Sequence, residues 1–354
     1  MLKWFGPKSQ SMLGIDISSQ SVKILELERN NDQYSVKGFG IEPVPEEAFE
    51  EGMIVNHQMV ADAIRRVISR EKLTSKQAAF AIPDSAVITR VIQLNEGLNE
   101  DEMEEIVILE ADKYIPYSID EINLDFQVIG PSAKNASMLD VLMVASRATN
   151  VDNRVEVAHL AGLTAMVIDV ESYAVERVVA EVSQQLPAEG VDKVIAIVDI
   201  GAKNTHLFVL DGMKIIFSRE EEFGGNQLIQ SIMKVYKVNQ YEAAQMCIHG
   251  KPDDFDKKVW QPFQESLMVQ IKRTLQFFFS TSSHQYIDYI LLAGGVSCSP
   301  GLDKAVEASV SVPTAHLNPF KNMNVDPPSK QADLELNAPA LLVACGLALR
   351  KLDK

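Results

Sequence analysis

The 354-residue sequence is poor in cysteine and in basic residues, and it has no long apolar run. Its three cysteines are far apart, which is typical of free thiols in a reducing compartment. Its 33 Lys and Arg stand against 49 Asp and Glu, a formal net charge of −16. Sequence-independent binding to nucleic acid or anionic lipid needs clustered cations, so the charge argues against both functions. No run reaches the roughly eighteen apolar residues of a membrane helix, and the six histidines have no metal-ligand spacing.

The first eleven residues also lack the apolar centre of a signal peptide, so a cytoplasmic protein is expected. These residues are interpreted as a flexible leader. Trp4 and Phe5 lie between Lys3 and Lys8, which leaves open a weak contact with a membrane surface or a partner.

One pattern occurs twice in the chain. Residues 13–27 and residues 197–210 each read as an apolar strand that ends in aspartate, a turn of small and polar residues, and a second apolar strand. Such a turn offers backbone N–H groups and hydroxyls to an anion. A single copy is common in sheet proteins, but two copies predict two similar lobes whose turns face one another as a phosphate clamp.

The first turn carries the residues that an anion needs. Ser18, Ser19 and Ser21 supply hydroxyls, and Lys23 follows Asp16 by seven residues. Hydroxyls, backbone amides and one ammonium group can therefore point toward the same phosphate.

Asp16 and Asp199 end the corresponding strands of the two hairpins and are expected to lie across a cleft. Mg²⁺ prefers few carboxylates together with water and phosphate oxygens. Each aspartate taken alone is explained as a turn-capping carboxylate. The matched pair favours a magnesium–phosphate site.

A third element follows the apolar residues 291–293, where Gly294 and Gly295 precede a run of small residues. Two glycines let the backbone approach a flat or anionic ligand that side chains would obstruct. The position of this turn, after a strand of the second lobe, predicts a roof over a nucleoside.

Apolar periodicity predicts an α/β organisation in which helices cover the sheets. Residues 87–163 read as a βαββα subdomain inserted into the first lobe, and a Pro- and Gly-containing junction follows at 184–192. Helices are expected over 56–68, from 99, and over 151–161, 172–182, 257–279 and 338–352. The predicted domains are the leader 1–11; the first lobe 12–86, 164–186 and 338–354; the insertion 87–163; the core of the second lobe, 192–218 and 285–337; and its subdomain 219–284.

The order of these motifs resembles the ATPase fold of actin, Hsp70, hexokinase and the division protein FtsA, with duplicated RNase H-like lobes and an FtsA-like 1C insertion. The resemblance covers essentially the whole chain. Residues 13–23, the insertion after 81–83, and segments 110–117 and 342–350 are similar to the PilM family, the cytoplasmic actin-like proteins of type IV pilus assembly.

The resemblance implies ATP and Mg²⁺ as cofactors and a role for each matching residue. Val269 stands where Hsp70 has an acidic ribose ligand, so that contact is not implied. Glu171 falls where related filament proteins have an acidic residue that orients the attacking water. The implied nucleotide-binding residues are Asp16, Ser18, Ser19, Gln20, Ser21, Lys23, Asp199, Gly201, Asn204, Thr205, Gly224, Gly225, Lys272, Gln276, Gly294, Gly295, Val296 and Ser299, with Asp16 and Asp199 holding Mg²⁺ largely through water.

The function implied is a Mg-ATP-binding scaffold of the pilus platform at the inner face of the bacterial inner membrane. In the PilM family a groove near the insertion takes the cytoplasmic N-terminal tail of PilN. The residues favour nucleotide binding over turnover, so a weak or partner-dependent ATPase is the most that is expected. Contacts with other platform and motor proteins, and self-association, stay open.

Two alternatives share the fold. A small-molecule kinase needs a catalytic aspartate at the floor of a substrate cleft, and no such residue is evident. An FtsA-like filament protein is expected to end in an amphipathic membrane helix, whereas residues 338–349 are nearly all apolar and are expected to be buried.

Overall fold

The first lobe is built on a six-stranded sheet with the order β10-β6-β1-β2-β3-β16. Strands β1 to β3 are consecutive and antiparallel because short turns join them, and β6 and β10 add in parallel on the other side of β1. A short hairpin of β4 and β5 follows β3. The bounds are β1 (Ser11–Ile17), β2 (Ser21–Asn30), β3 (Gln33–Pro43), β4 (Phe49–Glu50), β5 (Met53–Ile54), β6 (Gln77–Ile82), β10 (Thr164–Val170) and β16 (Asn324–Val325).

The second lobe repeats this arrangement in a five-stranded sheet with the order β13-β12-β11-β14-β15. Again three antiparallel strands come first, and parallel strands join the first of them. The duplicated topology confirms the two lobes predicted from the repeated hairpin. The bounds are β11 (Val194–Ile200), β12 (Thr205–Asp211), β13 (Lys214–Glu221), β14 (Tyr289–Ala293) and β15 (Thr314–His316).

These strands and their helices come from a computed structural model that describes residues 11–350, apart from 31–32, 134, 136 and 249–250. Two predicted segments lie outside the described residues: the leader except for Ser11, and the last four residues of the first lobe, 351–354. In the part described, no helix is long and apolar enough to cross a membrane.

Helices cover the outer faces of both sheets. α1 and α3 pack on the first sheet, and α5 to α8 pack on the second. α1 begins at His57, one residue after the predicted start, because the Asn56 side chain caps it and accepts a hydrogen bond from the N–H of Met59 at 3.2 Å. The bounds are α1 (His57–Glu71), α3 (Ala148–Leu160), α5 (Gly225–Tyr236), α6 (Gln240–Ile248), α7 (Gln261–Thr281), α8 (Leu302–Val310) and α9 (Gln331–Asn337).

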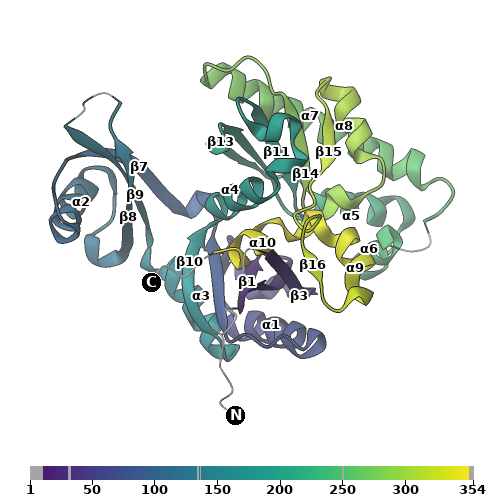
Figure 1. Ribbon diagram of the computed structural model, residues 1–354. Coiled ribbons are helices and arrows are strands. Elements are labelled where there is room, and N and C mark those ends of the chain that lie inside the picture. Colours follow the sequence, from purple (N-terminus) through teal and green to yellow (C-terminus); the bar gives the residue numbers. More distant parts are fainter. Residues whose placement is uncertain (1–10, 31–32, 134, 136, 249–250, 351–354) are drawn as a thin grey trace, which may run out of the picture.

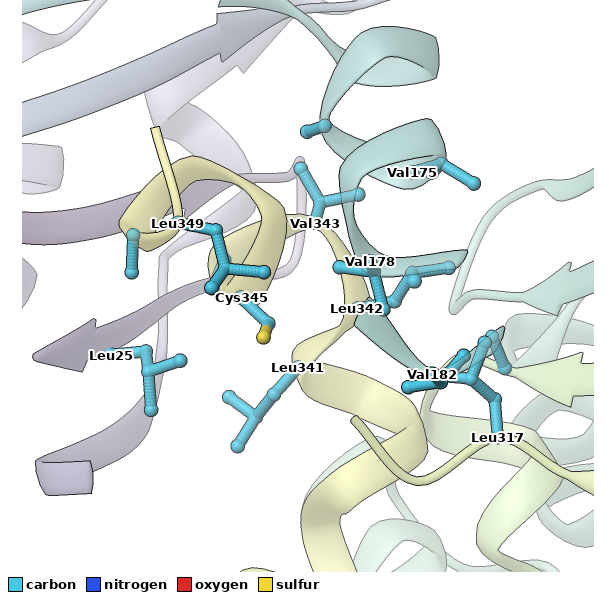
Figure 2. Packing of buried hydrophobic residues seen from close by; sticks show 14 of the residues in the cluster. Leu25, Val175, Val178, Val182, Leu317, Leu341, Leu342, Val343, Cys345 and Leu349 are labelled. Atoms are coloured by element: carbon cyan, nitrogen blue, oxygen red, sulfur yellow. The ribbon is translucent and has the colours of Figure 1, made fainter. Parts of the chain in front are cut away.

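Two further helices, α4 (Glu171–Glu181) and α10 (Leu342–Ala348), lie between the two sheets (Figure 1). Their side chains form one core with the facing sides of both sheets. Figure 2 shows Leu341, Cys345 and Leu349 in this core, with Val178 of α4 on one side and Leu25 of β2 on the other. A shared core of this kind joins the lobes through the layer beneath the cleft.

The helix predicted over 338–352 is shorter than expected. Residues 338–341 form a 3₁₀ turn, η9 (Ala338–Leu341), before α10. Leu341, with φ −97° and ψ 14°, interrupts the helical backbone between η9 and α10. The carbonyl of Pro339 in η9 accepts a hydrogen bond from the N–H of Gly294 at 2.8 Å. This hydrogen bond links the predicted glycine turn at Gly294 to the core between the lobes.

The insertion projects beside the first lobe (Figure 1). Its sheet has the order β7-β9-β8 and packs on α2, which starts with a capping box between Asn99 and Glu102. α3, predicted as its last element, contributes Val157 and Ala158 to the core of the first lobe instead, where it packs against α1. The bounds are β7 (Val87–Asn95), α2 (Glu100–Tyr114), β8 (Ile122–Pro131) and β9 (Met138–Arg147).

Candidate functional site

A cavity of about 730 Å³ lies where the turns of the two lobes meet the insertion. It is large enough for a cofactor-sized ligand. The structure brings most of the predicted site residues into its lining: Asp16, Ser18, Ser19, Gln20, Ser21, Lys23, Glu171, Asp199, Gly201, Asn204, Gly294 and Gly295.

The β1–β2 hairpin places Asp16 directly opposite Lys23. Lys23 Nζ donates a hydrogen bond to Asp16 Oδ2 at 2.7 Å. Burial lowers the pKa of Lys23, but Asp16 outweighs that effect, so the pKa is raised and the ammonium stays charged. The turn is closed by the N–H of Ser18, which donates to the carbonyl of Ser21 at 3.0 Å. A fixed cation therefore lies beside the first turn.

Asp199 is the last residue but one of β11, just as Asp16 is the last but one of β1. The pKa of Asp199 is raised to about 6: burial is the largest cause, Lys23 lowers the pKa and Asp16 raises it. Asp16 and Asp199, one from each lobe, both line the cavity. The second turn is closed by the N–H of Gly201, which donates to the carbonyl of Asn204 at 2.9 Å.

Three predicted residues support the second turn from behind and do not line the cavity. The Thr205 hydroxyl donates to the carbonyl of Phe223 at 2.6 Å. The N–H of Gly225 donates to the carbonyl of Gly201 at 3.0 Å. A Cβ on Gly224 would lie within 3.0 Å of the carbonyl oxygens of Gly201 and Ala202, so only glycine fits this approach.

Only part of the glycine turn after β14 lines the cavity. Gly294, with φ 85°, and Gly295 line the cavity, whereas Val296 and Ser299 are outside its lining. Lys272 and Gln276 are exposed on α7 and are also outside it. The structure therefore brings together the two turns predicted to hold phosphate and the first glycines of the third element, but the predicted contacts of the adenosine helix lie outside the cavity lining.

Glu171 and Asp169 lie at the junction of β10 and α4 with different surroundings. Asp169 forms an ion pair with Arg177 and accepts a hydrogen bond from the N–H of Val170 at 2.8 Å. Glu171 is the first residue of α4 and lines the cavity. Burial, followed by the charges of Asp16, Asp84 and Asp199, raises the pKa of Glu171 well above its usual value.

Sequence reasoning missed Arg154, which is 6% exposed and lines the cavity from α3. Arg154 Nε donates to the carbonyl of Ala81 at 3.1 Å, and Nη1 donates to the carbonyl of Asn150 at 3.1 Å. Burial lowers the pKa of this guanidinium, while Glu171 and Asp16 raise it. No local pattern marks this residue, because it reaches the cavity only through the packing of α3 on the first lobe.

His206 also lines the cavity and was missed. It is opposite Asp199 in the β11–β12 hairpin, just as Lys23 is opposite Asp16 in the first hairpin. Burial lowers the pKa of His206 to about 4, so the imidazole is neutral at pH 7. An alignment of the two repeats at their aspartates finds this residue, because each partner follows its aspartate by seven positions.

The insertion supplies a largely apolar part of the same cavity wall. Ile88, Ile115 and Ile122 line it together with Tyr117 and Arg147. The Arg147 guanidinium lies 4.2 Å from the centre of the Tyr117 ring. Polar turns and an apolar wall therefore share one cavity.

Comparison with known proteins identifies the relatives of this chain. A family model described as type IV pilus assembly protein PilM matches residues 14–352. A solved PilM–PilN type IV pilus biogenesis complex contains a chain that is 27% identical; the match covers 97% of this chain and 99% of that one, with a TM-score of 0.79. The ethanolamine utilization protein EutJ from Carboxydothermus hydrogenoformans is 15% identical over 99% of this chain and 92% of its own, with a TM-score of 0.59, and shares the fold.

Proposed function

The chain belongs to the PilM family of type IV pilus assembly proteins and has an actin-like fold, and we propose that it is a Mg-ATP-binding scaffold that holds the N-terminal tail of a PilN protein. Nucleotide binding and tail binding would occur in adjoining parts of one cavity. The nucleotide would bias the closure of the two lobes and thereby change the affinity for the tail.

The donor set fits a magnesium nucleotide. Asp16 and Asp199 offer the carboxylate oxygens that Mg²⁺ prefers, and both line the cavity. Lys23 and the two turns would hold the phosphates. A Cβ on Gly294 would lie within 3.0 Å of Ile200 and Asp199, so the backbone leaves no room for a side chain there. Bound Mg²⁺ would supply charge neutralisation at the phosphates.

Binding is better supported than hydrolysis. The raised pKa of Glu171 makes its carboxylate a stronger proton acceptor, but it also favours the protonated form, which cannot take a proton from water. We therefore propose that Glu171 activates water only in the fraction of chains in which it is ionised, so that turnover is slow or depends on a partner.

The shared cavity is the observation that carries this proposal. Its lining joins the phosphate turns to Ile88, Tyr117 and Arg147 of the insertion. The solved PilM–PilN complex shows that a similar protein has PilN as its partner. By analogy, the apolar wall would take the PilN tail and recruit the chain to the inner face of the inner membrane through that partner.

Arg147→Glu is expected to weaken binding of a synthetic PilN tail by about tenfold or more, since Arg147 is exposed in the cavity wall and charge reversal also removes its stacking on Tyr117. Fluorescence anisotropy with a labelled tail peptide measures the change. Arg90→Glu is the matched control, because Arg90 is an exposed arginine on β7 outside the cavity lining. Equal affinity in wild type and Arg147→Glu would place the tail elsewhere.

A further inference from the structure

Three potential metal ligands from separate elements meet beside the Asp16–Asp199 pair. Asp84 begins the 3₁₀ turn η2 (Asp84–Ala86) after β6, Glu171 begins α4, and His206 is the second residue of β12. One ligand atom from each lies within 4.8 Å of the other two. No local sequence spacing brings them together, since they are far apart in the chain.

The cluster contains an acceptor that lacks a partner. Asp84 Oδ2 is buried and accepts no hydrogen bond from any described residue. The atom lies 4.0 Å from His206 Nε2. An unpaired buried carboxylate oxygen is costly unless a ligand completes its coordination. Burial raises the pKa of Asp84 despite hydrogen bonds from Ser172, as expected for a carboxylate without a nearby cation.

The imidazole is held in place and is uncharged. The His206 ring stacks on Phe208 with 3.9 Å between the ring centres, and Nε2 lies 2.7 Å from Ser218 Oγ. With its pKa lowered to about 4, His206 does not form a charged pair with Asp84 at pH 7. A neutral imidazole is the form that coordinates metals.

We propose that Asp84, Glu171 and His206 bind one divalent cation of the Mn²⁺ or Zn²⁺ class. Two carboxylates balance the charge of such an ion, and the imidazole nitrogen favours these ions over Mg²⁺, which takes oxygen ligands. Metal–ligand distances of about 2.1 Å require the three side chains to move together by only about 1 Å. This site is separate from the Asp16–Asp199 pair and needs no nucleotide.

The cation would bridge the two lobes. Asp84 and Glu171 belong to the first lobe, whereas His206 is on a strand of the second sheet. Because the ligands come from both lobes, the ion would favour the arrangement in which the lobes are close together. The chain would then have a means of closing the cleft that is independent of ATP.

The test is isothermal titration of untagged, metal-free full-length protein with MnCl₂, and separately with ZnCl₂, in millimolar MgCl₂ and without nucleotide. One ion per chain is expected, and Asp84→Asn and His206→Gln are expected to weaken its binding at least tenfold. His159→Gln, a change at an exposed histidine on α3, is the matched control and should bind as wild type does.

Three outcomes would overturn the proposal: no stoichiometric binding, binding that survives both Asp84→Asn and His206→Gln, or binding that Asp16→Asn abolishes while His206→Gln retains it. The last result would place the ion at the Asp16–Asp199 pair. Circular dichroism of each variant shows that lost binding is not lost folding. The proposed Mg-ATP function is tested separately through Asp199, so either proposal can fail alone.

Discussion

Asp199→Asn is expected to stabilise the nucleotide-free protein at pH 7 by about 2–3 kcal/mol, while it lowers Mg-ATP affinity at least tenfold. Burial raises the pKa of Asp199 from 3.8 to about 6 in the folded chain. The folded state therefore binds the proton more tightly than the unfolded state does. Ionised Asp199 costs stability at neutral pH, and the uncharged amide of asparagine removes that cost together with a metal ligand.

The direction of the stability change follows from the difference between the pKa of Asp199 in the folded chain and in the unfolded chain. As pH rises from about 4 to 6, the wild-type carboxyl loses its proton first in the unfolded chain, so wild-type stability falls through that window. The advantage of Asp199→Asn should accordingly be largest above pH 6 and nearly absent below pH 4. Urea denaturation at pH 4 and pH 7 measures the stability change, and calorimetric titration with Mg-ATP measures binding.

Asp120→Asn is a suitable control, because Asp120 is exposed and lies outside the cavity lining. It should alter neither quantity. A stability gain without loss of ATP affinity would remove Asp199 from the metal site. Loss of affinity without a pH-dependent gain would instead contradict the raised pKa of this carboxylate.

Gly346→Ala is expected to destabilise the protein by about 3 kcal/mol or more, or to prevent folding. A Cβ on Gly346 would lie well under 3.0 Å from the backbone of Ala174 in α4. Backbone atoms cannot rotate away, so α10 would have to move. Arg177 Nε also donates to the carbonyl of Gly346 at 2.9 Å, and any shift of α10 would disturb that bond.

The direction of this effect is opposite to that of helix propensity. Alanine within a helix is favoured over glycine by about 1 kcal/mol, so a loss of stability reports the packing of α10 against α4. Gly295→Ala is the matched control, because nothing lies within 4 Å of its Cβ position. Thermal unfolding followed by circular dichroism compares the two variants. A Gly346→Ala protein as stable as Gly295→Ala would show that α10 and α4 are not packed this closely.

The elements that the sequence predicted best are those whose pattern is local. The repeated hairpins alternate apolar residues and end at Asp16 and Asp199, and the structure places both aspartates at equivalent strand ends. The first helix was predicted over 56–68, and the structure has it from His57 with Asn56 as its cap. The last helix was predicted too long, because the non-helical backbone of Leu341 separates the turn η9 from α10, which ends at Ala348, and periodicity marks neither boundary.

The same distinction between local patterns and distant contacts applies to the candidate site. Strand alternation, turn composition and the repeat itself were enough to predict the two hairpin turns and their aspartates, because these features depend on residues close together in the chain. The roles of Asp84, Glu171, Arg154 and His206 depend on contacts between elements far apart. Only the tertiary structure, in which α4 lies between the two sheets, shows that Asp169 is paired with Arg177, that Glu171 faces the cavity, and that His206 from the second lobe meets Asp84 from the first. Burial and charge at a site are sums over all surrounding elements, so they exist only once the chain has folded.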